Sequence, residues 1–108
     1  MQFQVAFKHM ESSEALKEYA EVKIENTIKK LVKKPVLINV TFSVDRNEHV
    51  AHCGISGLHG TDIQVQQKDD NMYSAVDKLA DKIEAQLRRH KEKLSRRSAK
   101  KPSDIELQ

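Results

Sequence analysis

The chain has very little of the residues that build disulfide frameworks, phosphate loops or membrane spans. It contains one cysteine, three glycines, two prolines and no tryptophan, and aromatic residues make up 5% of its 108 residues. A lone Cys53 cannot form an internal disulfide, and three glycines cannot form a glycine-rich phosphate loop. No apolar run approaches the ~20 residues that cross a bilayer, and the N-terminus lacks the pattern of a signal peptide. These absences predict a cytoplasmic protein with no membrane contact.

Residues that carry catalysis or hold metals are also scarce. His49 and His52 fall on opposite faces of a predicted strand, and no second cysteine or carboxylate cluster completes a tetrahedral site. Cys53 is expected to point inward as a packed thiol, which argues against a nucleophile paired with a histidine. Carboxylates are spread over exposed helix flanks. The sequence therefore predicts no enzyme, no metal, no cofactor and no small-molecule substrate.

Positive charge, by contrast, is concentrated in one segment. Residues 78–101 hold ten of the 19 lysines and arginines and three of the 16 acids, which gives this segment a charge of +7 (ten minus three). The other residues sum to −4 (nine minus thirteen), so the net charge of +3 conceals a strong polarity. A basic block on an amphipathic helix indicates a surface for a polyanion, with RNA the leading candidate.

Four segments alternate apolar and polar residues with the period of a half-buried strand. They are residues 2–8, 36–44, 50–55 and 62–68. In the third, Ala51, Cys53 and Ile55 are expected to face inward; in the fourth, Ile63 and Val65. A polar turn is predicted at residues 45–48 and another at residues 57–60.

Two segments have helical spacing of apolar residues. The first follows Ser12 and Ser13, either of which can cap it, and is expected to run to about Lys34, where Pro35 ends it. The second follows residues 69–71 and is expected to reach Arg97. We thus predict one domain over residues 1–97 and a flexible tail over residues 98–108.

The order β-α-β-β-β-α predicts an α+β fold. A right-handed βαβ crossover makes the first two strands parallel, and the last three form an antiparallel meander, so the four-stranded sheet is mixed. Each strand has one apolar and one polar face. Both helices are therefore expected to pack on one face of the sheet and to leave the other to water.

Charges sort by sign on both predicted helices, at about 100° per residue. On the second helix one flank holds Lys78, Lys82, Arg89, Lys93 and Arg96, and the other holds Asp77, Asp81, Glu84 and Glu92. On the first, one flank holds Lys23, Lys30 and Lys33, and the other holds Glu14, Glu18, Glu21 and Glu25. If the helices lie side by side, the two basic flanks could meet in one groove. A solvated face with pairs within each helix is the alternative.

Three segments carry a family resemblance. They are residues 13–19 (SEALKEY), 71–77 (NMYSAVD) and 86–94 (QLRRHKEKL), together with Lys82 and Ile83. Over about residues 1–95 the chain resembles the bacterial ribosome hibernation promoting factors, a family that also holds ribosome-associated inhibitor A and was once labelled sigma-54 modulation protein. The resemblance implies a double-stranded-RNA-binding-domain-like fold and no enzymatic activity.

The resemblance also implies a partner and a mechanism. It implies a hibernation factor that binds the small ribosomal subunit and its rRNA between head and body, overlaps the mRNA channel and the A and P sites for tRNA, and silences translation in stationary phase or stress. Carried over by position, the rRNA-binding residues are Lys23, Lys82, Arg89, Lys91 and Lys93; Lys30, Lys78 and Arg88 extend this set on charge alone. We expect the free protein to be monomeric.

Three other functions stay open from the sequence. The chain could be a translation inhibitor that acts on single ribosomes, since branches of the resembled family differ in this respect. It could be a general double-stranded RNA-binding module with no specific affinity for the ribosome. It could also be a protein-interaction domain that uses the polar face of the sheet. The salt dependence of binding and the choice of partner distinguish these possibilities.

Overall fold

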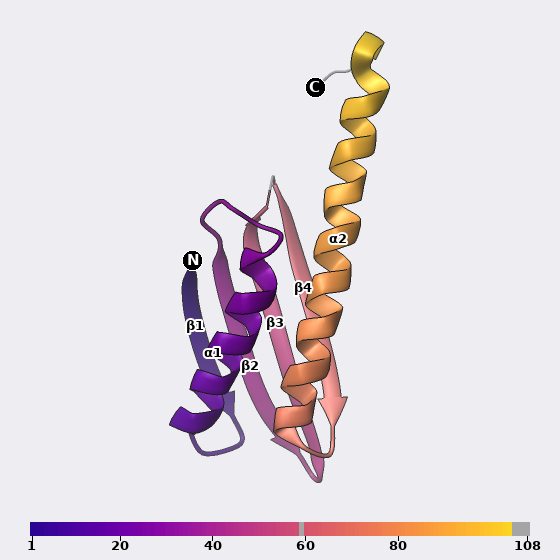
Figure 1. Ribbon diagram of the computed structural model, residues 1–108. Helices are drawn as coiled ribbons and strands as arrows, with labels where there is room; N and C mark the ends of the chain where they lie inside the picture. The colour runs from indigo at the N-terminus through magenta and orange to yellow at the C-terminus, as the bar shows by residue number, and fades with distance from the viewer. Residues whose placement is uncertain (59, 105–108) are drawn as a thin grey trace.

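The computed structural model describes residues 1–58 and 60–104, with side chains through residue 93 (Figure 1). Its elements are β1 (Gln2–Lys8), α1 (Glu14–Lys29), β2 (Leu37–Asp45), β3 (Glu48–Leu58), β4 (Thr61–Asp69) and α2 (Met72–Asp104). The predicted β-α-β-β-β-α order is confirmed.

The strands form one mixed sheet in the order β1-β2-β3-β4. β1 and β2 are parallel, while β2, β3 and β4 pair antiparallel. A single row crosses the whole sheet, because Val5 lies opposite Val40, Val40 opposite Cys53, and Cys53 opposite Val65. These residues share the face that the alternating pattern predicted to be apolar.

Arg46 and Gly57 have positive φ angles within the meander. Arg46 has a φ of 60° in the tight turn between β2 and β3, in the polar segment that the sequence marks as a turn. Near the end of β3, Gly57 has a φ of 100°, and a Cβ there would lie 3.4 Å from the carbonyl oxygen of Pro35. Glycine is suited to this position because it has no side chain to strain the backbone. The register between β3 and β4 shifts here, between Ile55 and Leu58.

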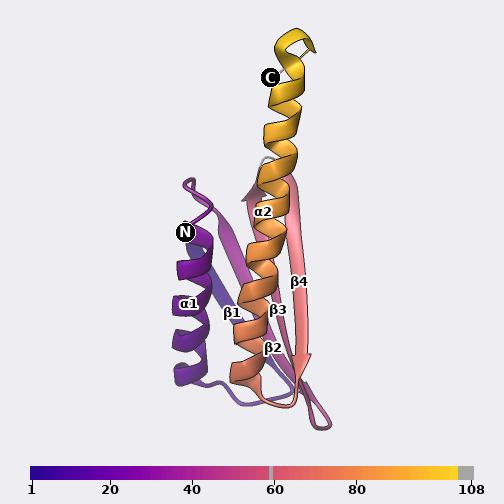
Figure 2. The ribbon, with the colours of Figure 1, turned by 45° about the vertical axis from the view of Figure 1, so that its right-hand side comes forward.

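Both helices lie on the same face of the sheet, as predicted (Figures 1 and 2). The core fills the layer between them and the strands. Its largest fully buried side chains are Phe42, Ile24, Ile28, Ile38, Ile55, Leu79, Ile83, Val40, Val76 and Cys53. Because Cys53 is enclosed in this layer, burial raises the pKa of its thiol to about 12. It is therefore an unreactive thiol at neutral pH, as the inward prediction implied.

The predicted start of α1 agrees with the structure, but its predicted end does not. Ser13 is the N-cap, and its Oγ accepts a hydrogen bond from the Leu16 N–H at 3.2 Å. The prediction that α1 runs to about Lys34 is wrong, since the helix ends at Lys29. The carbonyl of Ile28 accepts from both Leu31 N–H, at 2.9 Å, and Val32 N–H, at 2.8 Å. This tight turn ends the helix before Pro35 is reached.

α2 continues beyond Arg97, where its end was predicted, and reaches Asp104 (Figure 1). The flexible tail expected over residues 98–108 stays a prediction, and its last four residues lie outside the described part of the chain. Among the residues that the structure describes, no helix is both long and apolar enough to cross a membrane.

Candidate nucleic-acid interface

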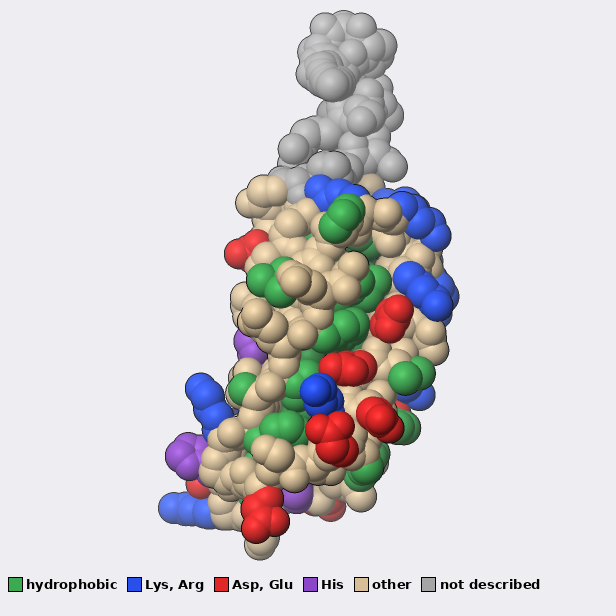
Figure 3. Space-filling model, turned by 90° about the vertical axis from the view of Figure 1, so that its left-hand side faces the viewer, with side chains coloured by type: hydrophobic (Ala, Val, Ile, Leu, Met, Phe, Trp, Pro, Cys, Tyr) green, Lys and Arg blue, Asp and Glu red, His purple; other side chains and the backbone are tan. Residues whose placement is uncertain are grey.

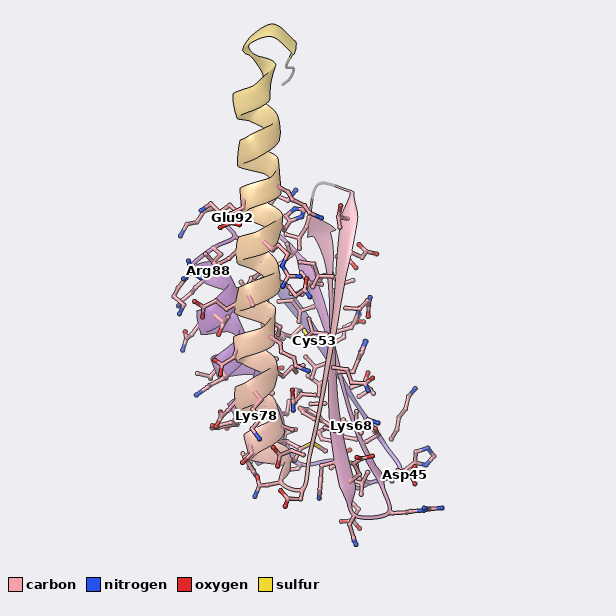
Figure 4. The ribbon with its side chains drawn as sticks, turned by 90° about the vertical axis from the view of Figure 1, so that its right-hand side faces the viewer. Asp45, Cys53, Lys68, Lys78, Arg88 and Glu92 are labelled. Atoms are coloured by element: carbon pink, nitrogen blue, oxygen red, sulfur yellow. The ribbon has the colours of Figure 1, made fainter. Side chains whose placement is uncertain are left out.

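The orientation of α2 decides where its charges lie. One flank faces β4: the Lys82 Nζ donates to the carbonyl oxygen of Gln66 at 2.8 Å, and the Lys78 Nζ lies 2.7 Å from the Asp69 Oδ2. Figure 4 shows Lys78 on this helix and Lys68 on the far face of the sheet. We call Lys78, Lys82, Arg89 and Lys93 the α2 basic row; it follows the β4 side of the helix.

The opposite flank of α2 faces α1 and carries acids. The Lys23 Nζ lies 3.2 Å from the Asp77 Oδ1, and the Lys30 Nζ lies 3.7 Å from the Glu84 Oε1. The expectation that two basic flanks meet in one groove is therefore wrong. The basic flank of α1 meets the acidic flank of α2, so the charges between the helices are paired.

Tyr19 reinforces this contact between the helices. Its hydroxyl donates to the Asp77 Oδ1 at 2.5 Å, which raises the pKa of Tyr19 and lowers that of Asp77. The Tyr19 ring also meets Tyr73 edge-on, with centroids 5.1 Å apart. Tyr73 is 42% exposed, and Met72 beside it is buried in the core.

The eight predicted rRNA-binding residues divide into two groups. Those that already have a partner are Lys23, Lys30, Lys78, Lys82 and Arg88. Arg88, labelled in Figure 4, lies 2.8 Å from Glu84, one helical turn earlier. Arg89, Lys91 and Lys93 are exposed and have no ion pair with any acid that the structure describes. These three can bind a phosphate without first releasing a carboxylate.

Further cations gather where α1 ends, beside α2. An open cavity of about 350 Å³ has Leu31, Val32, Leu58 and Leu87 as its apolar lining, and Lys33, Lys34, His90 and Lys91 also border it. Lys29 lies nearby on the last turn of α1. We call Lys29, Lys33, Lys34 and Lys91 the cationic cluster. Its members have no ion pair within the described residues.

Sequence reasoning named only Lys91 of this cluster as a binding residue. The signal that could have found the others is the segment 29–34, in which two lysine pairs bracket Leu31 and Val32. Those two apolar side chains turn inward and are half-buried, so the four lysines around them are held at the surface. With Arg89 and Lys93 on the β4 side of α2, the cluster places unpaired cations on two sides of this end of the domain, where they suit contacts with a phosphate backbone.

Other kinds of site are not supported by the described residues. They contain no group of three or more His, Cys, Asp or Glu side chains that could hold a metal ion. Cys53 is buried within the sheet, with its thiol protonated at neutral pH. The geometry therefore favours electrostatic binding of a polyanion.

The Asp69–Lys78 ion pair makes a testable contribution to stability. Lys78 is the main cause that holds the pKa of Asp69 at about 2, below the ordinary value of 3.8. This lowered pKa means that the stabilisation is complete above about pH 4 and is lost as the pH falls through 2. An Asp69→Asn variant should therefore unfold at lower urea concentration than the native chain at pH 7, with the difference shrinking towards pH 2.

Urea midpoints measured at pH 7, 4, 3 and 2 would check this expectation. The matched control is Asp62→Asn, since Asp62 is exposed on the same strand and has no ion pair with a described residue. A difference between Asp69→Asn and the native chain that stays constant over the whole range would contradict the role of this pair.

The structure is thus a two-layer α+β domain, with two helices on one face of a four-stranded sheet and unpaired cations at one end. The model of the family described as "Sigma 54 modulation protein / S30EA ribosomal protein" matches residues 3–95. The chain belongs to this family.

Individual relatives agree with the family match. The chain is 35% identical over 96 residues to the ribosome hibernation promoting factor of Salmonella typhimurium, an alignment that covers 87% of this chain and 97% of the relative. A ribosomal subunit interface protein from Coxiella burnetii superposes with a TM-score of 0.75 at 27% identity, covering 84% of this chain and 98% of the other. The N-terminal domain of Thermus thermophilus Protein Y shares the fold, with a TM-score of 0.71, 22% identity and coverage of 79% and 92%.

Proposed function

We propose that the protein is a ribosome hibernation factor that binds the small ribosomal subunit through rRNA phosphates. The observation that carries the proposal is the group Arg89, Lys91 and Lys93, three exposed cations without acid partners in the described part of a chain whose relatives are named for ribosome hibernation. Lys29, at the end of α1, and Lys33 and Lys34, just after it, extend this contact. The contact is sequence-independent, because phosphate oxygens are the same at every nucleotide.

The mechanism that we propose is occlusion. A rigid domain held between the head and body of the small subunit blocks the mRNA channel and the A and P sites for tRNA. Translation is thereby silenced in stationary phase or stress, in the cytoplasm, without any chemical step. The Tyr19–Asp77–Lys23 contact supports this role because it fixes α1 against α2 and so fixes the cations of both helices relative to each other. The free protein is a monomer.

A direct binding experiment tests the proposal. The purified chain is sedimented with small subunits, with large subunits and with a plain RNA duplex, at several salt concentrations. We expect binding to small subunits at least tenfold tighter than to either alternative. If each of the six cations neutralises one phosphate, the logarithm of the binding constant should fall with the logarithm of salt concentration with a slope of roughly −4 to −5.

Each rival function has its own outcome in this experiment. Equal affinity for the duplex and the small subunit would favour a general double-stranded RNA-binding module. Association that does not change with salt would favour a protein-interaction domain. A sucrose gradient of stationary-phase lysate adds the cellular test, since the protein should migrate with ribosomal particles. Migration only at the top of the gradient would contradict hibernation.

A further inference from the structure

β1 is an edge strand whose outer side is open. It lies at one margin of the sheet, and its Gln2 N–H donates to the Val36 carbonyl at 3.1 Å, towards β2. Successive residues of a strand direct their backbone groups to opposite edges. Phe3, Val5 and Phe7 therefore direct their N–H and C=O groups outward, where no residue that the structure describes pairs with them.

The two edges of the sheet differ in this respect. At β4, the other margin, the Lys82 ammonium covers the Gln66 carbonyl at 2.8 Å. A lysine placed on an edge in this way is a common device against unwanted strand pairing. β1 carries its one charged residue, Lys8, at its last position and contains no proline. Its outward backbone groups are left available to a further strand.

The surface beside this edge is apolar. Phe3, Val5 and Phe7 are half-buried and pack against the core on the face that α1 covers. Figure 3, which views the molecule from this side, shows a hydrophobic stripe running along it. An added strand could bury alternate side chains against this stripe while its backbone pairs with β1.

An acidic row borders the stripe. Glu14, Glu18, Glu21 and Glu25 follow the flank of α1 that faces away from α2. None of them has an ion pair within the described residues. Two lysines lie between them in the sequence, Lys17 and Lys23, and Lys23 points to Asp77 on the other flank. Figure 3 shows the acidic side chains gathered beside the stripe. A strand added at β1 would therefore meet negative potential on its helix-facing side.

We propose that the open edge of β1 binds an extended, basic polypeptide segment, which adds to the sheet as a fifth strand. Every second side chain of this segment would face α1, where apolar residues bury against the stripe and lysine or arginine residues reach the acidic row. The intervening side chains would be polar, to match Gln2 and Gln4 on the outer face. This protein-binding edge is separate from the cationic surface proposed to bind rRNA.

A second copy of the chain does not suit this edge. Antiparallel pairing of two β1 strands around a two-fold axis would bring two copies of the acidic row to the same junction. Like charges placed opposite one another across a strand pair are destabilising. The occupant is therefore a segment of opposite charge, and the isolated protein stays monomeric.

The test uses the full chain and a synthetic ten-residue peptide. In the peptide, threonine occupies every second position, and lysine alternates with valine at the positions between. We expect it to bind and to slow amide exchange at Phe3, Val5 and Phe7 by at least tenfold, measured by hydrogen–deuterium exchange with NMR detection. A peptide with glutamate in place of lysine should bind at least tenfold more weakly.

Two matched controls separate strand addition from simple attraction of charge. Methylating the backbone nitrogens of the threonines, or of the intervening residues, blocks opposite edges of the peptide, so one set should abolish binding and the other should preserve it. The variant E18Q/E25Q should bind the basic peptide roughly three- to tenfold more weakly and bind small subunits unchanged. Absence of binding at millimolar peptide, binding without protection of the three amides, or equal effects of both methylation sets would overturn the proposal.

Discussion

A variant in which Arg89, Lys91 and Lys93 are all replaced by glutamine is expected to bind small ribosomal subunits roughly 100-fold more weakly than the native chain. Each lost phosphate contact is worth about 1 kcal/mol net, and about 1.4 kcal/mol corresponds to a factor of ten. Removing three contacts should also make the salt slope shallower by about 2 to 3. Glutamine has nearly the helix propensity of lysine and arginine, so α2 should stay folded.

Co-sedimentation with small subunits over a range of salt concentrations measures both quantities, and circular dichroism checks the fold. The matched control removes three positive charges elsewhere, at Lys8, Lys17 and Arg46, and should leave the affinity nearly unchanged. A third variant, with glutamine at Lys23, Lys30 and Lys78, should lose less than the first. Those three side chains already pair with Asp77, Glu84 and Asp69, so binding phosphate would require them to leave a carboxylate.

If the control triple at Lys8, Lys17 and Arg46 weakened binding as much as the first variant, net charge alone would explain the affinity. The affinity would then not depend on where the cations lie. If the variant at Lys23, Lys30 and Lys78 lost the most affinity, the interface would be formed by the cations that already have acid partners and not by Arg89, Lys91 and Lys93.

Phe42→Ala is expected to lower the stability of the domain by about 3–5 kcal/mol. Phe42 is fully buried on β2, and its ring centroid lies 5.4 Å from that of Phe7. Truncating a buried phenylalanine costs about 3–5 kcal/mol, while domains of this size are stable by roughly 5–15 kcal/mol. A loss of about 3 kcal/mol corresponds to a melting temperature lower by roughly 12 °C or more.

Thermal melting followed by circular dichroism measures the shift. Val22→Ala is the control, because Val22 is 59% exposed on α1 and its truncation should cost less than about 0.5 kcal/mol. A melting temperature for Phe42→Ala within a few degrees of the native value would mean that the sheet and helices pack less tightly than the buried positions indicate.

Period-two alternation was enough to predict the sheet. The pattern around Val40, Cys53 and Val65 placed each of these residues on the correct face, and the order of elements fixed the parallel pairing of β1 with β2. Local chemistry also predicted the start of α1, since Ser13 needs only its own helix to act as a cap.

The relation between the two helices could not be predicted in the same way. A helical wheel gives the angle between two residues of one helix, but it does not give the rotation of that helix against a neighbour. Tyr19 and Asp77 are 58 residues apart in the sequence, and their hydrogen bond depends on how both helices sit on the sheet. For this reason the sorting of charges by sign was correct, whereas the meeting of two basic flanks was not.

The position of the lysines of residues 29–34 at the surface also depends on tertiary packing, which the sequence pattern does not show. Helical spacing continues through Leu31 and Val32, so the sequence extended α1 across them. In the structure these two residues turn towards Leu58 and Leu87 around the cavity, and this turn ends the helix and brings Lys33 and Lys34 beside Lys91. Packing outweighed the local periodicity at this position.

The enclosure of Cys53 has a practical consequence for experiments on this protein. It is the only cysteine of the chain, and its thiol is both inaccessible and protonated at neutral pH. A second cysteine introduced on either charged surface would therefore react alone with a maleimide dye or spin label, without a cysteine-free background. Fluorescence measurements on two such variants, one labelled at each surface, could then follow the cationic end and the β1 edge separately.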